Sequence, residues 1–174
     1  GALLRTVSVA LPFQADAFTA SVVQAITPRT RLLFVSHMAS TTALKLPLPA
    51  LLREARARGV LTLVDGAHAP GQIDLALDEL GADFYTGNCH KWLCAPKGAG
   101  FLWVRRDRQA DIRPLAISHG ATAPRTDRSR FLLEFDWTGS IDPTPWLSVP
   151  AALRTLGDLL PGGWPALRAR NRAL

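Results

Sequence analysis

The sequence predicts an α/β fold with a mostly parallel sheet and helices on both faces. Three near-continuous apolar runs, at residues 31–36, 60–64 and 83–86, are typical of strands covered on both sides. Helical segments separate these runs, and this alternation favours right-handed crossovers between parallel strands. Polar residues follow each run, so they are expected at the sheet edge where open α/β sheets bind ligands.

The remaining elements are predicted from local signals along the chain. Residues 7–10 have the pattern of a strand, and Asp16 is placed to cap a helix that continues to residue 26, before a proline. A proline and a glycine bound an amphipathic helix at residues 47–59. A short helical segment at residues 73–80 is closed by a glycine, and residues 101–104 form a further apolar run.

Composition predicts a globular, soluble protein and limits its partners. The chain has 174 residues, 48 % of them hydrophobic and 20 % charged, which suits one domain or a piece of a larger one. The net charge is +6, but the arginines are scattered among acidic residues, so no nucleic-acid partner is expected. No apolar run approaches the ~20 residues that span a bilayer, so no membrane partner is expected. Cys89 and Cys94 lie in one loop and indicate no disulfide framework, which predicts a cytoplasmic location.

Lysine is rare in this chain, and one lysine lies in a distinctive loop. Lys45, Lys91 and Lys97 are the only lysines among many arginines. A lysine amine can lose its proton and condense with a carbonyl, which a guanidinium cannot do. Lys91 follows a histidine in the loop after the strand at residues 83–86. Taken alone, a solvated loop lysine is the alternative interpretation.

An amine and a carboxylate at neighbouring strand ends predict a pyridoxal phosphate site. Lys91 would hold the cofactor aldehyde as a Schiff base, and Asp65 would pair with the protonated pyridine nitrogen. His68 is placed to hydrogen-bond the phenolic oxygen of the ring, and Asn88 and His90 to donate to the phosphate. The alternatives are a turn cap for Asp65 and satisfied loop histidines. No metal site is predicted.

Two stretches carry a family resemblance. Residues 64–71 (Val-Asp-Gly-Ala-His-Ala-Pro-Gly) and residues 81–98, which contain Gly-Asn-Cys-His-Lys-Trp-Leu-Cys, closely resemble the class V aminotransferase family of fold-type I pyridoxal phosphate enzymes. His-Lys-Trp-Leu at 90–93 and Trp-Thr-Gly-Ser-Ile-Asp-Pro at 137–143 are similar to the isopenicillin N epimerase-like branch. The resemblance covers most of the chain.

The resemblance implies roles for individual residues. Lys91 matches the Schiff-base lysine, Asp65 the partner of the pyridine nitrogen, and His68 a Gln or His position at the phenolic oxygen. Asn88 and His90 match positions near the phosphate.

Two serines and the domain boundary are also assigned by resemblance. Ser40 matches a position beside the cofactor ring that is often Asn, and Ser140 matches a hydroxyl position that reaches the phosphate of a partner subunit. A homodimer with shared active sites is therefore expected. Residues 1–142 are expected to be part of the cofactor-binding large domain, and residues 143–174 connecting helices that lead toward a small domain. Because family members are considerably longer, these 174 residues are expected to be inactive alone.

The implied function is an enzyme that acts at the α-carbon of a small amino-acid substrate. Lys91, once displaced from the cofactor, would act as the base at that carbon. Epimerisation, transamination, β-elimination and C–S cleavage share this step, so a cysteine desulfurase or C–S lyase is an alternative. A non-catalytic nucleotide-binding or interaction module on the same scaffold is another, weakened because no Gly-x-Gly-x-x-Gly or Gly-Lys-Ser/Thr signature follows a strand. A relative that retains only the scaffold is the third.

Overall fold

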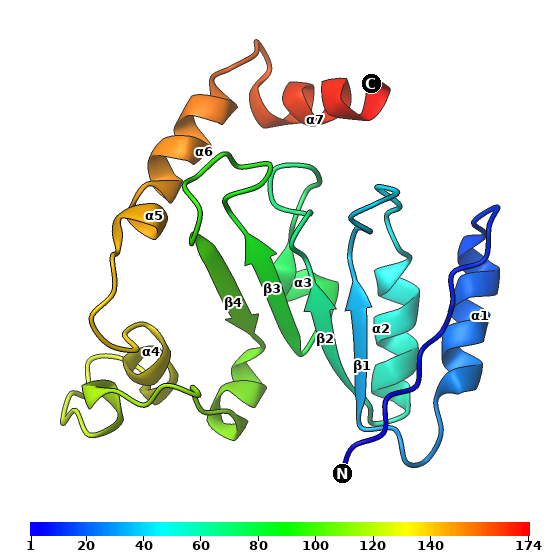
Figure 1. Ribbon diagram of the computed structural model, residues 1–174, viewed down its shortest axis with the longest axis horizontal. Coiled ribbons are helices and arrows are strands. Elements are labelled where there is room, and N and C mark those ends of the chain that lie inside the picture. The colour runs from blue at the N-terminus through cyan, green and yellow to red at the C-terminus, as the bar shows by residue number, and fades with distance from the viewer.

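A computed structural model describes residues 1–174 and contains one four-stranded sheet (Figure 1). The strands lie side by side in chain order: β1 (Leu32–Ser36), β2 (Leu61–Asp65), β3 (Phe84–Asn88) and β4 (Gly100–Val104). β1, β2 and β3 are parallel, and β4 is antiparallel to β3. The predicted α/β class and mostly parallel sheet are therefore confirmed.

Seven α-helices accompany the sheet. They are α1 (Ala15–Ala25), α2 (Leu48–Ala57), α3 (Leu77–Leu80), α4 (Arg130–Phe135), α5 (Thr144–Leu147), α6 (Val149–Gly157) and α7 (Gly163–Ala173). Short 3₁₀ turns occur at Arg106–Asp111 and His119–Ala121. None of the helices combines the length and the apolar character needed to cross a membrane.

The main core lies between one face of the sheet and helices α1 and α2. In α2 the leucines at 48, 51 and 52 are almost completely buried, and arginines occupy the outer side of the helix. They pack with Val35, Val64 and Tyr85, which the two-residue alternation of the strands directs to the same face. This layer holds β2 and β3 in register and so sets the positions of the loops that follow them.

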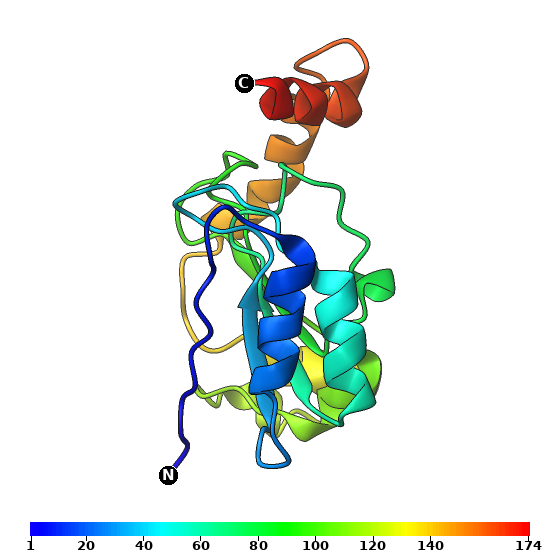
Figure 2. The same cartoon turned by 90° about the vertical axis from the view of Figure 1, so that its right-hand side faces the viewer.

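The opposite face of the sheet carries no helix within these residues. Figure 2 shows α1, α2 and α3 on one side of the strands and the N-terminal segment running past β1 on the other. Phe34 is 62 % exposed and Leu102 is 41 % exposed on that second face. Helices were expected on both faces of the sheet. Within residues 1–174 they cover one face.

Three local predictions differ from the structure. Asp16 does not cap α1, because the helix begins at Ala15 with Gln14 at the N-cap, so Asp16 lies within its first turn. Residues 7–10 form no strand, because no neighbouring strand pairs with them; Val7 is only partly buried against the core. The helix predicted over residues 73–80 is limited to α3, because Ile73, Leu75 and Leu77 reach the core with a spacing of two residues. That spacing is typical of extended chain and not of a helix.

A second, smaller core supports the lysine loop. Cys89, Leu93, Ala95 and Ala99 are buried together against Val149, Ala152 and Trp164. Helices α6 and α7 thus pack on the loop that follows β3, and Arg168 of α7 forms an ion pair with Asp74 at 3.5 Å. The domain boundary at residues 142 and 143 stays a prediction.

Candidate active site

The predicted polar edge is built by the parallel pair β2 and β3. Asp65 is the last residue of β2 and is aligned with Ser36 of β1 and Thr86 of β3. Asn88 ends β3 two residues after Thr86, on the same face. These residues lie on the face opposite Val64 and Tyr85, at the carboxyl ends of the strands.

Asp65 begins a tight turn and keeps one oxygen for another partner. Its Oδ1 accepts a hydrogen bond from the Ala67 N–H at 2.9 Å, and no hydrogen bond to Oδ2 is formed within the chain. Gly66 lies directly over the Tyr85 ring, where a Cβ atom would come within 2.1 Å of the ring atoms. Only glycine therefore lets this turn pack on Tyr85, which fixes the carboxylate at the sheet edge.

His68 joins the turn after β2 to the lysine loop. Lys91 Nζ lies 3.0 Å from His68 Nε2, and the Trp92 indole N–H donates to His68 Nδ1 at 3.3 Å. Gly71 adopts a positive φ of 90°, and a Cβ atom there would come within 2.7 Å of the Trp92 carbonyl oxygen. The two loops are therefore in direct contact through both backbone and side chains.

The backbone of the lysine loop is held by its own hydrogen bonds. Cys89 N–H donates to the Ala99 carbonyl at 3.0 Å, and Ala95 N–H donates to the Cys89 carbonyl at 3.0 Å. Cys94 N–H donates to the Lys91 carbonyl at 3.1 Å, which closes the turn after the lysine. The loop is thus a fixed support for the Lys91 side chain.

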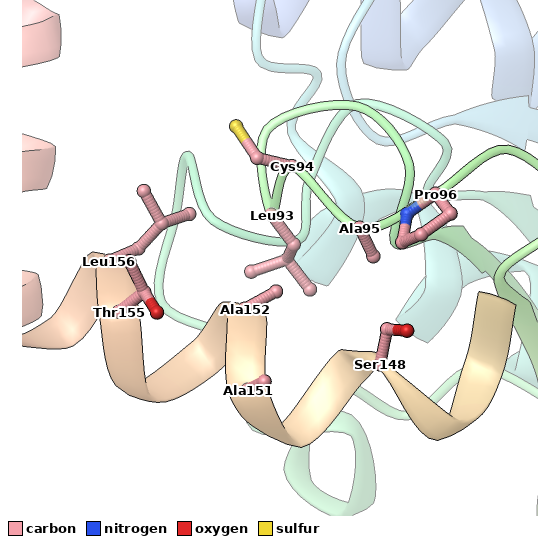
Figure 3. Close-up of a pocket in the computed structure, with 9 residues that line it drawn as sticks. All are labelled: Leu93, Cys94, Ala95, Pro96, Ser148, Ala151, Ala152, Thr155 and Leu156. Carbon is pink, nitrogen blue, oxygen red and sulfur yellow. The ribbon is translucent and has the colours of Figure 1, made fainter. Parts of the chain in front are cut away.

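An apolar cavity of about 280 Å³ lies between this loop and α6. Figure 3 shows the Leu93 side chain pointing toward Ala152, whereas the Cys94 sulfur points away from α6. The cavity contains none of the predicted site residues. Both cysteines are free thiols, and burial raises the pKa of the Cys89 thiol.

Asn88 and His90 lie shortly before the lysine in the chain, and only the His90 side chain is held by a hydrogen bond within the chain. His90 Nδ1 donates to the Ala99 carbonyl oxygen at 3.1 Å, so its Nε2 is left for a ligand. The Asn88 side chain forms no hydrogen bond within the chain and lies near Gly100. A neutral His90 presents Nε2 as an acceptor, so donation to a phosphate from this nitrogen needs a second ring proton.

The two predicted serines are exposed and form no hydrogen bond with the other predicted site residues. Ser40 is exposed in a turn after β1 that the Ala43 N–H to Ala39 carbonyl hydrogen bond closes. Ser140 is exposed in the segment between α4 and α5. Neither hydroxyl hydrogen-bonds to Asp65, His68 or Lys91. Their predicted roles, beside the cofactor ring for Ser40 and at the phosphate of a partner subunit for Ser140, stay predictions.

Sequence reasoning missed three supports of the site. Trp92 and Gly71 lie in the two stretches that carry the family resemblance, but only the contact between the two loops shows what they do. The third is a buried pair, in which His37 Nδ1 and the Tyr85 hydroxyl are 2.9 Å apart. Burial, and Lys45 to a lesser degree, lowers the pKa of His37 to about 4. Burial, with Asp65 as the second cause, raises the pKa of Tyr85.

The donor set matches the chemistry of pyridoxal phosphate. The primary amine of Lys91 suits an aldehyde, and the free carboxylate oxygen of Asp65 suits a protonated pyridine nitrogen. The imidazole of His68, which contacts that amine, suits the phenolic oxygen beside the aldehyde. No three His, Cys, Asp or Glu side chains in the chain are grouped to hold a metal ion.

Comparison with known families and proteins relates the chain to one family and to longer members of it. A family model described as Aminotransferase class-V matches residues 7–131. The chain is 44 % identical to isopenicillin N epimerase from Streptomyces clavuligerus over 94 % of its own length and 43 % of that protein. It is 45 % identical to the Amycolatopsis lactamdurans isopenicillin N epimerase, over 100 % of its own length and 46 % of that protein. The chain thus spans less than half the length of these curated relatives.

A solved structure supports the same fold. The cystine C–S lyase C-DES in complex with its product, cysteine persulfide, matches with a TM-score of 0.66 and 29 % identity. The match covers 78 % of this chain and 38 % of that protein. The Escherichia coli cysteine desulfurase CsdA has the same TM-score at 23 % identity, over 80 % of this chain and 36 % of that protein, and shows the fold alone.

Proposed function

The chain belongs to the class-V aminotransferase family, and on that premise we propose that the protein acts at the α-carbon of an amino acid, as isopenicillin N epimerases do. Its cofactor is pyridoxal 5′-phosphate, which is also the cofactor in a C-DES variant structure 26 % identical to this chain. The observation that carries the proposal is the 3.0 Å contact between Lys91 Nζ and His68 Nε2. His68 follows Asp65 by three residues, so this contact brings the amine to the turn that begins with the carboxylate.

The residues of the proposed site divide cofactor binding and proton transfer among them. Lys91 binds the cofactor covalently through Nζ and, when released from it, takes the proton from the substrate α-carbon. Asp65 keeps the pyridine nitrogen protonated through its free Oδ2. His68 hydrogen-bonds the phenolic oxygen of the ring and orients Lys91 Nζ, and Asn88 and His90 bind the phosphate. The cofactor supplies an aldehyde and a ring that withdraws electrons from the bonds of the α-carbon.

Proton exchange at the α-carbon tests this proposal. The full-length protein, loaded with cofactor, is incubated with single amino acids in ²H₂O, and deuterium at the α-carbon is followed by NMR. Wild type should exchange at least one amino acid. Lys91→Arg, which keeps the charge but cannot condense with an aldehyde, should lower exchange by about 10³-fold or more. Lys97→Arg, at an exposed position of the same loop, is the matched control and should exchange normally. No exchange by wild type with any amino acid would overturn the proposal and favour a non-catalytic module.

A C–S lyase or cysteine desulfurase activity is the second candidate. It is favoured by the likeness to C-DES and by 33 % identity to an L-cysteine desulfhydrase-like protein of Epichloe uncinata, over 77 % of this chain. Sulfide release from L-cysteine distinguishes it from epimerisation, which returns both enantiomers and no sulfide. The 44 % and 45 % identities to the two epimerases support epimerisation as the first candidate.

We also propose a homodimer with shared sites, in which Ser140 serves the partner subunit. Its exposure in the segment between α4 and α5, away from the contacts of Lys91, supports this assignment. Mixing Lys91→Arg subunits with Ser140→Ala subunits would create one complete site in each mixed dimer. Activity should therefore recover on mixing, and no recovery in a verified mixed dimer would contradict shared sites.

A cytoplasmic location is proposed on the basis of the two free thiols. Fractionation of producing cells with an antibody against the protein tests it. Recovery outside the cytoplasmic fraction would contradict it.

A further inference from the structure

Both ring nitrogens of His68 face the lysine loop, and consecutive residues contact them. Lys91 Nζ lies 3.0 Å from Nε2, and Trp92 Nε1 lies 3.3 Å from Nδ1. The roles of the two contacts differ, because a lysine amine changes its proton count whereas an indole nitrogen does not. The Trp92 contact therefore determines which nitrogen of His68 carries hydrogen.

A count of donors and acceptors gives the tautomer of His68. An indole N–H can only donate, so Nδ1 has to accept through its lone pair and carries no proton. A neutral imidazole has one N–H, which then lies on Nε2. This hydrogen is directed toward Lys91 Nζ, which can accept it only when the amine is neutral and has a lone pair, the form that reacts as a nucleophile.

The position of Trp92 is itself constrained by the fold. The backbone of Gly71 passes so close to Trp92 that a Cβ atom would lie 2.7 Å from the Trp92 carbonyl oxygen. Leu93, the next residue, is 6 % exposed in the second core against α6 and α7. Trp92 is thus held from both sides, although its own side chain is 47 % exposed.

We propose that Trp92 is a positioning residue that locks His68 in the tautomer with the proton on Nε2. The lock presents an N–H donor toward Lys91 Nζ. Because Nε2 then has no lone pair, His68 cannot compete with Lys91 as a base through Nε2. Its catalytic consequence rests on the proposed function, whereas the tautomer is read from the cofactor-loaded protein by a measurement that does not depend on turnover.

Nitrogen NMR of His68 reads the tautomer directly. The full-length protein is labelled with ¹⁵N-histidine, and the His68 signals are assigned by their loss in His68→Gln. Wild type loaded with cofactor should show a protonated Nε2 and an unprotonated Nδ1. Trp92→Phe keeps an aromatic ring but removes the donor, so part of the population should shift its proton to Nδ1. Trp146→Phe, which removes a partly exposed indole in α5, should leave the His68 signals unchanged.

Replacing Trp92 by β-(3-benzothienyl)alanine keeps the shape of indole and exchanges N–H for sulfur. This variant should reproduce the tautomer shift of Trp92→Phe even if the phenylalanine variant folds poorly. In the exchange assay, loss of one hydrogen bond should lower kcat about 5- to 10-fold with little change in KM. A wild-type Nδ1–H tautomer, or unchanged signals in both Trp92 variants, would overturn the inference.

The assay and the spectrum separate the two proposals. The expected tautomer in a protein that exchanges no amino acid would sink the proposed function and leave the Trp92 assignment standing. Exchange that depends on Lys91, in a protein whose His68 carries its proton on Nδ1, would sink the Trp92 assignment alone.

Discussion

Two aspartates lie at opposite ends of the same strand pair, and their surroundings differ. Asp83 directly precedes β3 and is 5 % exposed. Its Oδ2 accepts from the N–H and hydroxyl of Thr62 at 2.8 and 2.9 Å. Its Oδ1 pairs with Arg105 at 2.9 Å and Arg108 at 3.2 Å. Asp65, at the other end of β2, accepts one hydrogen bond and is only half-buried.

The difference separates a scaffold carboxylate from a site carboxylate. Both oxygens of Asp83 are occupied, so it has no capacity for a ligand and its removal would leave buried donors unpaired. Asp65 keeps an oxygen free at the edge where the loops of β2 and β3 meet. Both residues are aspartates, so the residue type does not distinguish them. The number of hydrogen-bond and ion-pair partners of each carboxylate does.

Replacing Asp65 should produce the largest change, and it should be in activity. In Asp65→Asn the amide oxygen still accepts from the Ala67 N–H, so folding and bound cofactor should be retained. Without the negative charge the pyridine nitrogen loses its proton, and α-carbon exchange should fall by about 10³-fold, equivalent to about 4 kcal/mol. Turnover near that of wild type would show that Asp65 only caps its turn.

Replacing Asp83 should instead reduce stability. Asp83→Asn leaves Arg105, Arg108 and Thr62 with a neutral, poorer acceptor, so the free energy of unfolding should fall by about 3 kcal/mol. Urea unfolding of the full-length protein measures this. Asp107→Asn is the matched control, because Asp107 also pairs with Arg105 but its side chain is 58 % exposed. Equal effects of the two substitutions would contradict the contrast.

The buried pair of His37 and Tyr85 lies at the same end of the sheet as Asp65. Because the pair is buried, it belongs to the scaffold and not to the ligand-binding edge. Burial lowers the pKa of His37 from 6.5 to about 4, so between these values the unfolded chain binds a proton that the folded chain does not. Stability should therefore fall as pH is lowered from 6.5 to about 4, by up to about 3 kcal/mol.

His37→Gln should remove this contribution to the pH dependence, as measured by urea unfolding at a series of pH values. His119→Gln changes an exposed histidine and should leave the dependence intact. An identical pH dependence in wild type and His37→Gln would show that the His37 pKa is not set by burial.

The strand ends and their polar residues could be predicted from sequence because each depends on local pattern. Apolar runs end at Ser36 and Asp65, and alternation sets which side chains share a face. The strand predicted at residues 7–10 failed because a strand also needs a neighbour, which local sequence does not specify. β4 runs antiparallel to β3 because the chain reverses its direction in the lysine loop, and local sequence does not specify this reversal either.

Within the site, sequence identified the reacting groups but not what orients them. Lys91 and His68 are separated by 23 positions, and their contact depends on how two loops pack. The same packing gives Trp92 and Gly71 their roles, through an indole N–H and an absent Cβ. Ser140 carries no signal of partnership within its own chain, so its role is testable only in the assembled protein.

Chemical trapping shows directly whether Lys91 is the residue that binds the cofactor covalently. The full-length protein loaded with pyridoxal phosphate is reduced with borohydride, digested, and mapped by mass spectrometry. The chain offers three lysines, and Lys45 and Lys97 are exposed and lie outside the contact with His68. The expected result is a pyridoxyl label on Lys91 that is absent in Lys91→Arg. A label on Lys45 or Lys97, with Lys91 unmodified, would contradict it.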